Sequence, residues 1–337
     1  MTNLRAIDLS CCTRMAALTP AFGGWRKTVV GVSMRRTKLL GVLWFYIAVA
    51  SLFATAAHAA GNGLVFQLDG PNGRFYLAGS MHLLHADRAD LPAPLERAYR
   101  DSASIVMEVD TDDADAERAG ARLLEAAQLA PEVSLPMLLG EARWNAVRAA
   151  LTEAGFDAER ASRFEPWGLA LLLTQAGFTR QGYTAAAGVE QQLTERARRD
   201  GKPISGLETT QMQIALLDGL EPSVQRQMLD LTLEELQEMP QMLDELDVAW
   251  RAGDLPHLEA LLLEGYRQMP ELYTALLVER NQRWVSQIRT WPPAAPPRLV
   301  IVGALHLVGE QGLPTLLQRA GYTIRRLTSS PTTRDQP

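Results

Sequence analysis

The sequence predicts an α/β (α+β) fold in which two related strand–Gly-x-x-His–helix–strand units form a central sheet, with a large, mostly helical segment between them. Two observations support this prediction. The block Tyr76-Leu-Ala-Gly-Ser-Met-His82 recurs near the carboxyl terminus as Val300-Ile-Val-Gly-Ala-Leu-His306, and Leu-Pro-x-x-Leu-x-Arg-Ala and a strand follow each copy. Between the copies, apolar residues recur at helical spacing over most of the chain.

Short runs rich in β-branched or aromatic residues, bounded by turn formers, are expected to be strands. They are Arg74–Ala78, Ser104–Val109, Lys202–Leu207, Leu299–Val302 and Thr323–Leu327. Helices are expected from Asp113 to about Arg199 and from about Thr209 to Trp291. The first helical stretch is expected to break at Pro131, Gly155, Pro166 and Gly182. The proline-rich stretch 292–297 is expected to be a stiff connector.

The N-terminal part has the pattern of an export signal. Met34 begins a short basic stretch, which is followed by the apolar run Leu39–Phe53 and by Ala57-His-Ala59, the small-x-small pattern of a signal peptidase site. Because the run is shorter than the roughly 20 residues of a membrane span, we expect cleavage after Ala59 and a periplasmic or secreted location without a stable span. Residues 1–33 have no regular pattern, and we expect them to be an extension upstream of the true start.

The composition argues against several classes of function. The chain has a formal net charge of −6, and the predicted leader is basic, so the remainder is more acidic still. Binding to nucleic acid through phosphates needs a basic surface and is therefore not expected. Both cysteines, Cys11 and Cys12, precede the predicted cleavage site, which leaves the exported chain without a thiolate nucleophile. The sequence contains no Walker loop, His-Glu-x-x-His motif, Gly-x-Ser-x-Gly elbow or dinucleotide fingerprint.

The two repeated histidines are the leading candidates for a functional site. Duplicated units of this kind usually lie side by side in one sheet, and loops at the carboxyl ends of strands bind ligands. We therefore expect His82 and His306 to approach one another. Neutral imidazole is the commonest transition-metal ligand and the usual acid or base near pH 7. Two core histidines bonded to the backbone are the alternative. His85 has no counterpart in the second copy, and His257 is expected on a helix surface.

Three acidic residues and one arginine are further candidates. Glu108 ends an apolar strand with Asp110 on the same side, and a carboxylate there needs a salt bridge, a helix N-terminus or a metal. Glu208 occupies an analogous place before a helix, where an acid also pairs with the helix dipole. Arg280 falls on the apolar face of its helix and needs an anionic partner, either an acid such as Glu108 or a substrate. An arginine that reaches solvent from the edge of that face is the alternative.

These residues belong to an ordered set of motifs that resembles the TraB/GumN family, with the GumN-like bacterial branch most similar. The motifs are Gly79-Ser-Met-His82-Leu-Leu, Val106-Met-Glu108-Val-Asp110, Gly188-Val-Glu190, Ile204-Ser-Gly-Leu-Glu208-Thr-x-x-Gln, Leu276-Leu-Val-Glu-Arg280-Asn-x-x-Trp and Val302-Gly-Ala-Leu-His306-Leu-Val-Gly. The resemblance implies one domain over residues 60–328, and the polar residues 329–337 are expected to be a disordered tail. Glu190 stands where the family is expected to have Asp.

The resemblance extends to a superfamily with the Tiki proteases, erythromycin esterases and ChaN-like haem-binding lipoproteins. It implies a metal-dependent hydrolase of the Tiki type, acting on a polypeptide, in which His82, Glu108 and His306 hold a divalent Mn, Co or Zn ion. Arg280 would stabilise the developing oxyanion. A further carboxylate would transfer the proton, one of Asp110, Glu190 and Glu208. Two alternatives stay open: a metal-free esterase with a histidine base, acting on small esters, and a non-enzymatic haem-binding, metal-binding or envelope accessory protein.

Overall fold

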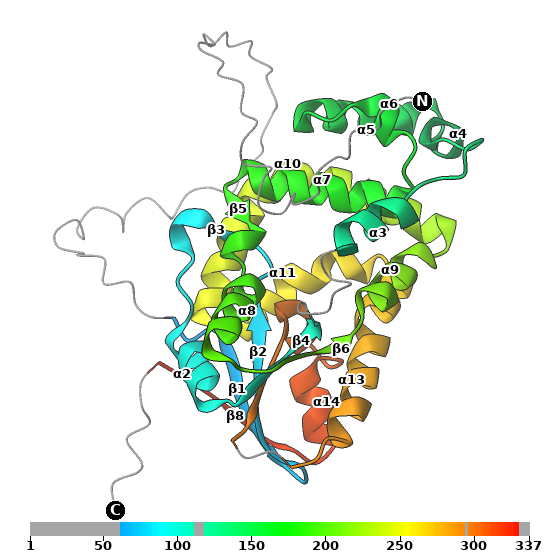
Figure 1. Ribbon diagram of the computed structural model, residues 1–337. Coiled ribbons are helices and arrows are strands. Elements are labelled where there is room, and N and C mark those ends of the chain that lie inside the picture. The colour runs from blue at the N-terminus through cyan, green and yellow to red at the C-terminus, as the bar shows by residue number, and fades with distance from the viewer. Residues whose placement is uncertain (1–60, 111–117, 294–295, 330–337) are drawn as a thin grey trace, which may run out of the picture. The chain divides into compact units, whose positions relative to one another are not determined.

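The computed structural model describes residues 61–110, 118–293 and 296–329, which belong to the unit Ala60–Pro337 (Figure 1). The predicted N-terminal extension, the predicted signal and residues 330–337 of the predicted tail lie outside the described residues. Within the described part of the chain, no helix combines the length and the apolar character that crossing a membrane requires.

The centre of the fold is a six-stranded mixed sheet with the order β6-β4-β7-β2-β1-β8. Four strands run parallel, namely β2 (Gly73–Ser80), β4 (Ser104–Val109), β6 (Ile204–Glu208) and β7 (Arg298–Gly303). The remaining two complete one side, because β1 (Leu64–Gly70) pairs antiparallel with both β2 and β8 (Thr323–Arg326). The strands of the two repeated motifs, β2 and β7, are direct neighbours, which confirms the predicted α/β core.

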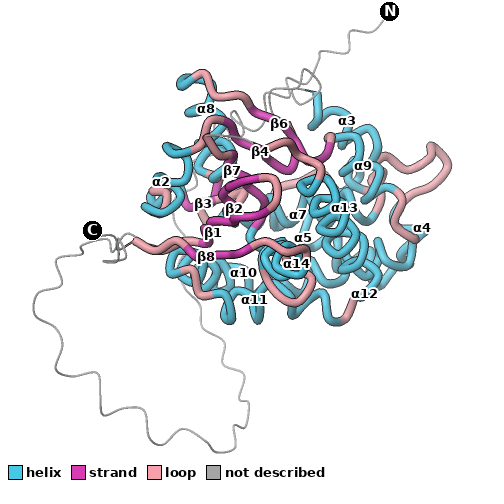
Figure 2. The backbone as a smooth tube through the Cα atoms, turned by 90° about the horizontal axis from the view of Figure 1, so that it is seen from below, coloured by secondary structure: helices cyan, strands magenta, loops and turns pink. Residues whose placement is uncertain are grey.

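Helices cover both faces of this sheet. In Figure 1 and Figure 2, α2 (Ala93–Asp101) and α8 (Val189–Asp200) lie on one face, and α13 (Glu279–Arg289) and α14 (Leu313–Arg319) lie on the other. Because helices cover both faces of the sheet, β7 is apolar and buried from Leu299 onward. The main hydrophobic core lies between the sheet and these helices.

The helical segment between the two copies has a core of its own. Its helices are α3 (Ala119–Ala126), α4 (Leu135–Leu139), α5 (Glu141–Ala154), α6 (Ala158–Ala161), α7 (Pro166–Arg180), α9 (Thr210–Asp218), α10 (Pro222–Ala252) and α11 (Leu255–Arg267). Residues of α4, α5, α7 and α10 form a second apolar cluster. Gly155 ends α5 in the left-handed conformation at φ +81°, and Pro166 begins α7, as predicted. In Figure 1, α7, α10 and α11 lie beyond the carboxyl ends of the parallel strands.

Three features differ from the prediction or were absent from it. The strand β1 was not predicted, although the turn formers between Gly70 and Gly73 separate two apolar runs. The last part of the helical stretch that was expected to end at Trp291 is divided into α12 (Pro270–Tyr273), a π-helical segment η5 (Thr274–Val278) and α13. A small second sheet joins β3 (Leu84–His85) to β5 (Tyr183–Thr184). The described residues also form the 3-10 turns η2 (Ala86–Arg88), η4 (Ala185–Ala187) and η6 (Ala304–Leu307).

Candidate functional site

The carboxyl ends of the four parallel strands meet at one edge of the sheet, where most of the predicted site residues lie. Ser80, the last residue of β2, is opposite Gly303, the last residue of β7. Val109 at the end of β4 is opposite Glu208 at the end of β6. Side chains at these strand ends therefore meet at one edge, where ligands usually bind in such sheets.

Gly303 lets Glu108 and His82 converge on one point of the backbone. Its N–H donates to Glu108 Oε1 at 2.7 Å. A β-carbon at Gly303 would lie 3.2 Å from His82 Nε2 and 3.3 Å from Glu108 Oε1. Because Gly303 has no side chain, this space stays free for His82 Nε2 from the first motif and for the Glu108 carboxylate from β4.

His82 is held by a carboxylate and remains accessible. Its Nδ1 lies 2.8 Å from Glu190 Oε1, and its side chain is 61% exposed. The same Glu190 oxygen accepts a hydrogen bond from Ser80 Oγ, while the buried Glu190 Oε2 has no partner among the described residues. The negative charge of Glu190 outweighs desolvation and raises the pKa of His82 to about 9. His82 therefore carries a proton at neutral pH in this state.

His306 is held by a neutral amide and is buried. Its Nδ1 lies 2.7 Å from Asn281 Oδ1. The Asn281 amide group donates to the backbone carbonyls of Gln311, at 2.7 Å, and of His306, at 3.3 Å, which fixes Oδ1 as the atom facing the ring. The proton of neutral His306 is thus assigned to Nδ1, and Nε2 keeps its lone pair. Burial lowers the pKa of His306 to about 4, so the ring is neutral at pH 7.

Arg280 joins two buried carboxylates and the second histidine. Its Nη2 donates to Glu108 Oε2 at 2.6 Å, and its Nε donates to Glu208 Oε2 at 3.0 Å. Its Nη1 lies 3.2 Å from His306 Nε2. Burial favours the neutral form of Glu108, but the two imidazoles, the guanidinium and the Gly303 N–H outweigh it and hold the pKa of Glu108 at about 2. Glu108 is therefore ionised, and the anionic partner expected for Arg280 is present twice.

A local change of helix geometry precedes Arg280. The π-helical segment η5 ends at Val278, one residue before α13 begins, and Arg280 Nη1 donates back to the carbonyl of Leu276 at 3.1 Å. The Trp284 ring packs against two of these side chains. Its centroid lies 4.7 Å from the guanidinium carbon of Arg280 and 4.4 Å from the centroid of the His306 ring. Single π-helical turns are frequent at functional sites because they re-aim one side chain.

The other predicted residues lie apart from this cluster or beside it. Asp110 follows β4 and is not among the described residues that line the cavity at the strand ends. His85 caps η2, where its Nδ1 accepts the Asp87 N–H at 3.2 Å. His257 is exposed near the start of α11, as predicted.

Two amides contribute to the site and were not predicted to do so. Asn281, which is fully buried, orients His306. Gln213 Nε2 donates to Glu108 Oε2 at 3.3 Å. The available signal for Asn281 was its place beside Arg280, since a second polar residue at the apolar face of a helix needs a buried partner.

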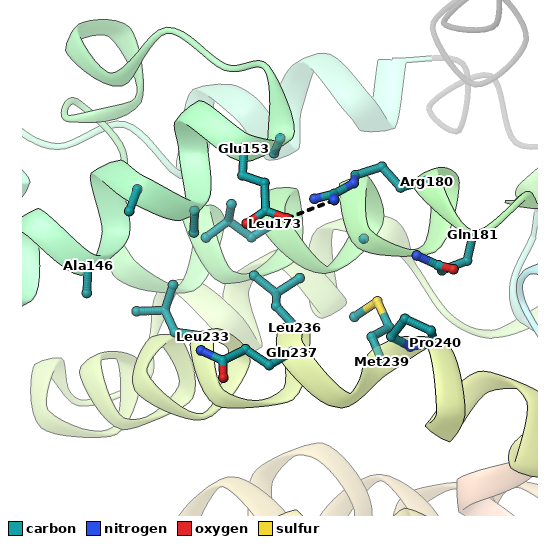
Figure 3. Close-up of a pocket in the computed structure, with 14 residues that line it drawn as sticks. Ala146, Glu153, Leu173, Arg180, Gln181, Leu233, Leu236, Gln237, Met239 and Pro240 are labelled. Carbon is teal, nitrogen blue, oxygen red and sulfur yellow. Dashed lines mark hydrogen bonds and ion pairs between the residues drawn. The ribbon is translucent and has the colours of Figure 1, made fainter. Parts of the chain in front are cut away.

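A cavity of about 270 Å³ opens beside these residues. Ser80, His82, Glu108, Arg280 and His306 supply its polar lining, and most of the remaining wall is apolar. A larger hollow of about 470 Å³ lies between α5, α7 and α10 (Figure 3). Its lining is mostly alanine, leucine and amide side chains, and its charged pair, Glu153 and Arg180, is at least half exposed. Of these two hollows, the smaller one therefore holds the converging, buried charged groups.

Comparisons with known proteins give one consistent result. A model of the TraB/PrgY/gumN family matches residues 64–326. The "Uncharacterized protein YbaP" of Escherichia coli (strain K12) is 28% identical over 247 residues, which cover 73% of this chain and 89% of that protein. The YbaP protein of Shigella flexneri gives the same identity and coverage. No solved structure matches the chain significantly. Because the family match spans nearly the whole described fold, the chain belongs to the TraB/PrgY/gumN family.

Proposed function

We propose that this chain is an exported, periplasmic hydrolase that cleaves peptide bonds with a divalent metal ion held by His82, Glu108 and His306. The orientation of the two imidazoles is the observation that carries the proposal. Nδ1 of His82 is paired with a carboxylate oxygen and Nδ1 of His306 with an amide oxygen, which leaves Nε2 of each ring for a ligand. Metal-binding histidines almost always have such an oxygen acceptor on the other ring nitrogen.

The donor chemistry fits a manganese, cobalt or zinc ion, and the arrangement fits it in part. His306 Nε2 and Glu108 Oε1 are 3.8 Å apart, a spacing open to two ligands that each lie about 2 Å from one ion. Among the described residues, however, no three His, Cys, Asp or Glu side chains are gathered as the ligands of one ion. Arg280 Nη1 contacts His306 Nε2 instead. Metal binding therefore requires Arg280 to release His306 and His82 to lose the proton on Nε2.

The protein residues around the proposed ligands have separate tasks. A bound ion would acidify a water molecule and polarise the scissile carbonyl. Arg280 keeps Glu108 ionised, and its release from His306 would free one N–H for the oxygen of the substrate carbonyl. Of the carboxylates considered for proton transfer, Glu190 is the one bonded to His82. Glu208 is engaged by Arg280 and Arg283, so Glu190 is the carboxylate proposed for proton transfer.

A metal-free hydrolase of small esters is the second candidate, and one observation favours it. Arg280 occupies Nε2 of His306, while Nε2 of the accessible His82 lies near Glu108. A histidine with a carboxylate on one ring nitrogen and an open second nitrogen is the arrangement of a general base or acid. In this version His82 activates water only after its Nε2 has lost a proton, which its raised pKa places above neutral pH, and Glu190 holds the ring in place.

Metal content and hydrolysis, measured together, separate the two candidates. Purified protein is loaded with manganese, cobalt or zinc, dialysed and analysed for elements, beside the variants His82→Ala, His306→Ala and the surface control His257→Ala. The first candidate predicts about one ion per chain in the wild type and in His257→Ala, and background metal in the other two.

Peptide hydrolysis should follow the metal content and stop on chelation. Metal at background in the loaded wild type, with ester hydrolysis that survives chelation, would select the second candidate. No turnover of peptides or esters under any of these conditions would refute both.

A further inference from the structure

The cavity at the strand ends has an apolar wall that takes no part in the chemistry above. Six of the large apolar side chains that line it are partly exposed: Leu83, Phe178, Leu262, Tyr266, Leu276 and Leu305. They come from five separate parts of the fold, namely the loop after β2, α7, α11, η5 and η6. Most large apolar residues of this fold are buried, so a contiguous open wall inside a cavity is a surface that a ligand would cover.

We propose that this wall is a subsite for a bulky apolar side chain, of leucine or phenylalanine size, next to the bond that is cleaved. The inference rests on the proposed hydrolase function and specifies its substrate class. The cavity of about 270 Å³ exceeds the roughly 150 Å³ of an apolar cavity that holds benzene, so such a side chain fits beside the strand ends. A glutamate side chain would lose its hydration against these leucines, and both cations of the cavity are already paired, Arg280 with Glu108 and Glu208 and His82 with Glu190.

Tyr266 supplies the one hydroxyl of this wall. No hydrogen bond to its phenol oxygen is found among the described residues, and this oxygen is not one of the buried atoms there that lack a partner, so it is open to solvent or to a ligand. Burial and the negative charge of Glu235 raise the pKa of Tyr266 to about 12, so the phenol keeps its proton and is a donor. The substrate supplies the missing acceptor, a backbone carbonyl of the residue whose side chain fills the wall. Tyr266 is thus a positioning residue for the substrate.

The test measures binding, so that it does not depend on turnover. The probes are acetylated, amidated pentapeptides in which the amide after the third residue is replaced by an uncleavable ketomethylene group and the third side chain is Leu, Phe, Gly or Glu. Titration calorimetry of the full chain should show Leu and Phe peptides binding about 10- to 100-fold more tightly than the Gly peptide, as expected for burial of a large apolar side chain. The Glu peptide should bind most weakly.

Matched variants distinguish the subsite from a general loss of structure. Leu262→Arg should reverse the preference towards the Glu peptide, whereas Ala260→Arg, on the exposed side of the same helix, should not. Tyr266→Phe should weaken binding of the Leu peptide about fivefold, the effect of one hydrogen bond. Tyr273→Phe is the control, since Tyr273 packs 6.2 Å from the Tyr266 ring but does not line the cavity.

The outcomes separate this inference from the proposed function. Equal affinity of the wild type for the Leu, Gly and Glu peptides, or no binding, overturns the subsite even if the chain hydrolyses peptides. An unchanged affinity in Tyr266→Phe overturns the role of the phenol. Selective binding of the Leu and Phe peptides by a protein that hydrolyses nothing supports the subsite and refutes the hydrolase.

Discussion

The two Gly-x-x-His motifs have similar sequences and lie on neighbouring strands, yet their histidines have opposite ionisation. His82 in the first copy is 61% exposed and bonded to a carboxylate, and its pKa is raised to about 9. His306 in the second copy is 4% exposed and bonded to an amide, and its pKa is lowered to about 4. The motif places the ring at the strand end, while burial and the residue on Nδ1 set its charge.

Under the proposed function, this difference means that the two proposed ligands start from different states. The accessible His82 ring is protonated and must lose a proton before it binds an ion. The buried His306 ring is neutral and already keeps a lone pair on Nε2. The predictions below either remove the cause of the difference or measure its size.

The largest effect is expected at Arg280, which contacts the second histidine and both buried carboxylates. Arg280→Ala leaves Glu108 and Glu208 without their shared cation, and breaking a buried ion pair in this way costs about 3–5 kcal/mol. Urea unfolding measures the loss. Arg289→Ala on the exposed side of the same helix should change the free energy of unfolding by less than about 0.5 kcal/mol. Equal effects of the two substitutions would contradict the ion-pair cluster.

Acid should destabilise the metal-free protein because burial disfavours protonation of His306, the histidine of the second copy. Unfolded His306 takes up a proton below pH 6.5, whereas the folded ring does so only near pH 4, so stability falls as the pH falls through this window. The shift corresponds to roughly 3 kcal/mol. Unfolding in the presence of a chelator at pH 7, 5.5 and 4.5 measures it, and His306→Gln should lose less stability over this range than the wild type. His82 contributes with the opposite sign, because stability from its raised pKa is lost as the pH rises through about 9.

The glycines of the two copies should respond differently to alanine. A β-carbon at Gly79 would lie 3.0 Å from Leu64 Cδ1 and 3.1 Å from Leu307 Cδ2, so Gly79→Ala overpacks the core and costs about 1–3 kcal/mol. At Gly303 the neighbours are the movable His82 and Glu108 side chains, so Gly303→Ala should cost less stability and reduce hydrolysis more than tenfold. Thermal unfolding and turnover of both variants test the contrast, and a reversed order would refute it.

Much of this comparison was predictable from the sequence because local patterns determine it. The runs 104–109 and 299–302 are short and apolar between turn formers, and both are strands of the sheet. The repeat around Gly79 and Gly303 indicated adjacent strands, and β2 and β7 are adjacent. Arg280 falls on an apolar helix face and was expected either to have an anionic partner, an acid or a substrate, or to reach solvent; it pairs with Glu108 and Glu208.

The parts that were not predictable depend on contacts between distant segments. Whether His82 or His306 is exposed depends on which helices cover each strand end, and matching motifs contain no such information. Glu190 bonds His82 only because α8 begins beside the first motif, where the backbone of Gly188 approaches the His82 carbonyl too closely for a side chain. The π-helical segment Thr274–Val278 before Arg280 was not predicted, because the apolar spacing was interpreted as one regular helix.

The smallest effect in free energy is expected at Glu190, although it bears most directly on the charge of the first copy. Glu190→Gln keeps the shape of the side chain and removes the charge that is the main cause of the raised pKa of His82. The His82 pKa, followed by NMR titration of its ring, should fall from about 9 towards the ordinary 6.5, while that of His306 should stay near 4. Glu195→Gln, at an exposed position of the same helix, should leave both unchanged. If His82 kept its pKa in Glu190→Gln, the field of Glu108 and not the local carboxylate would set its charge, and the two copies would differ through burial alone.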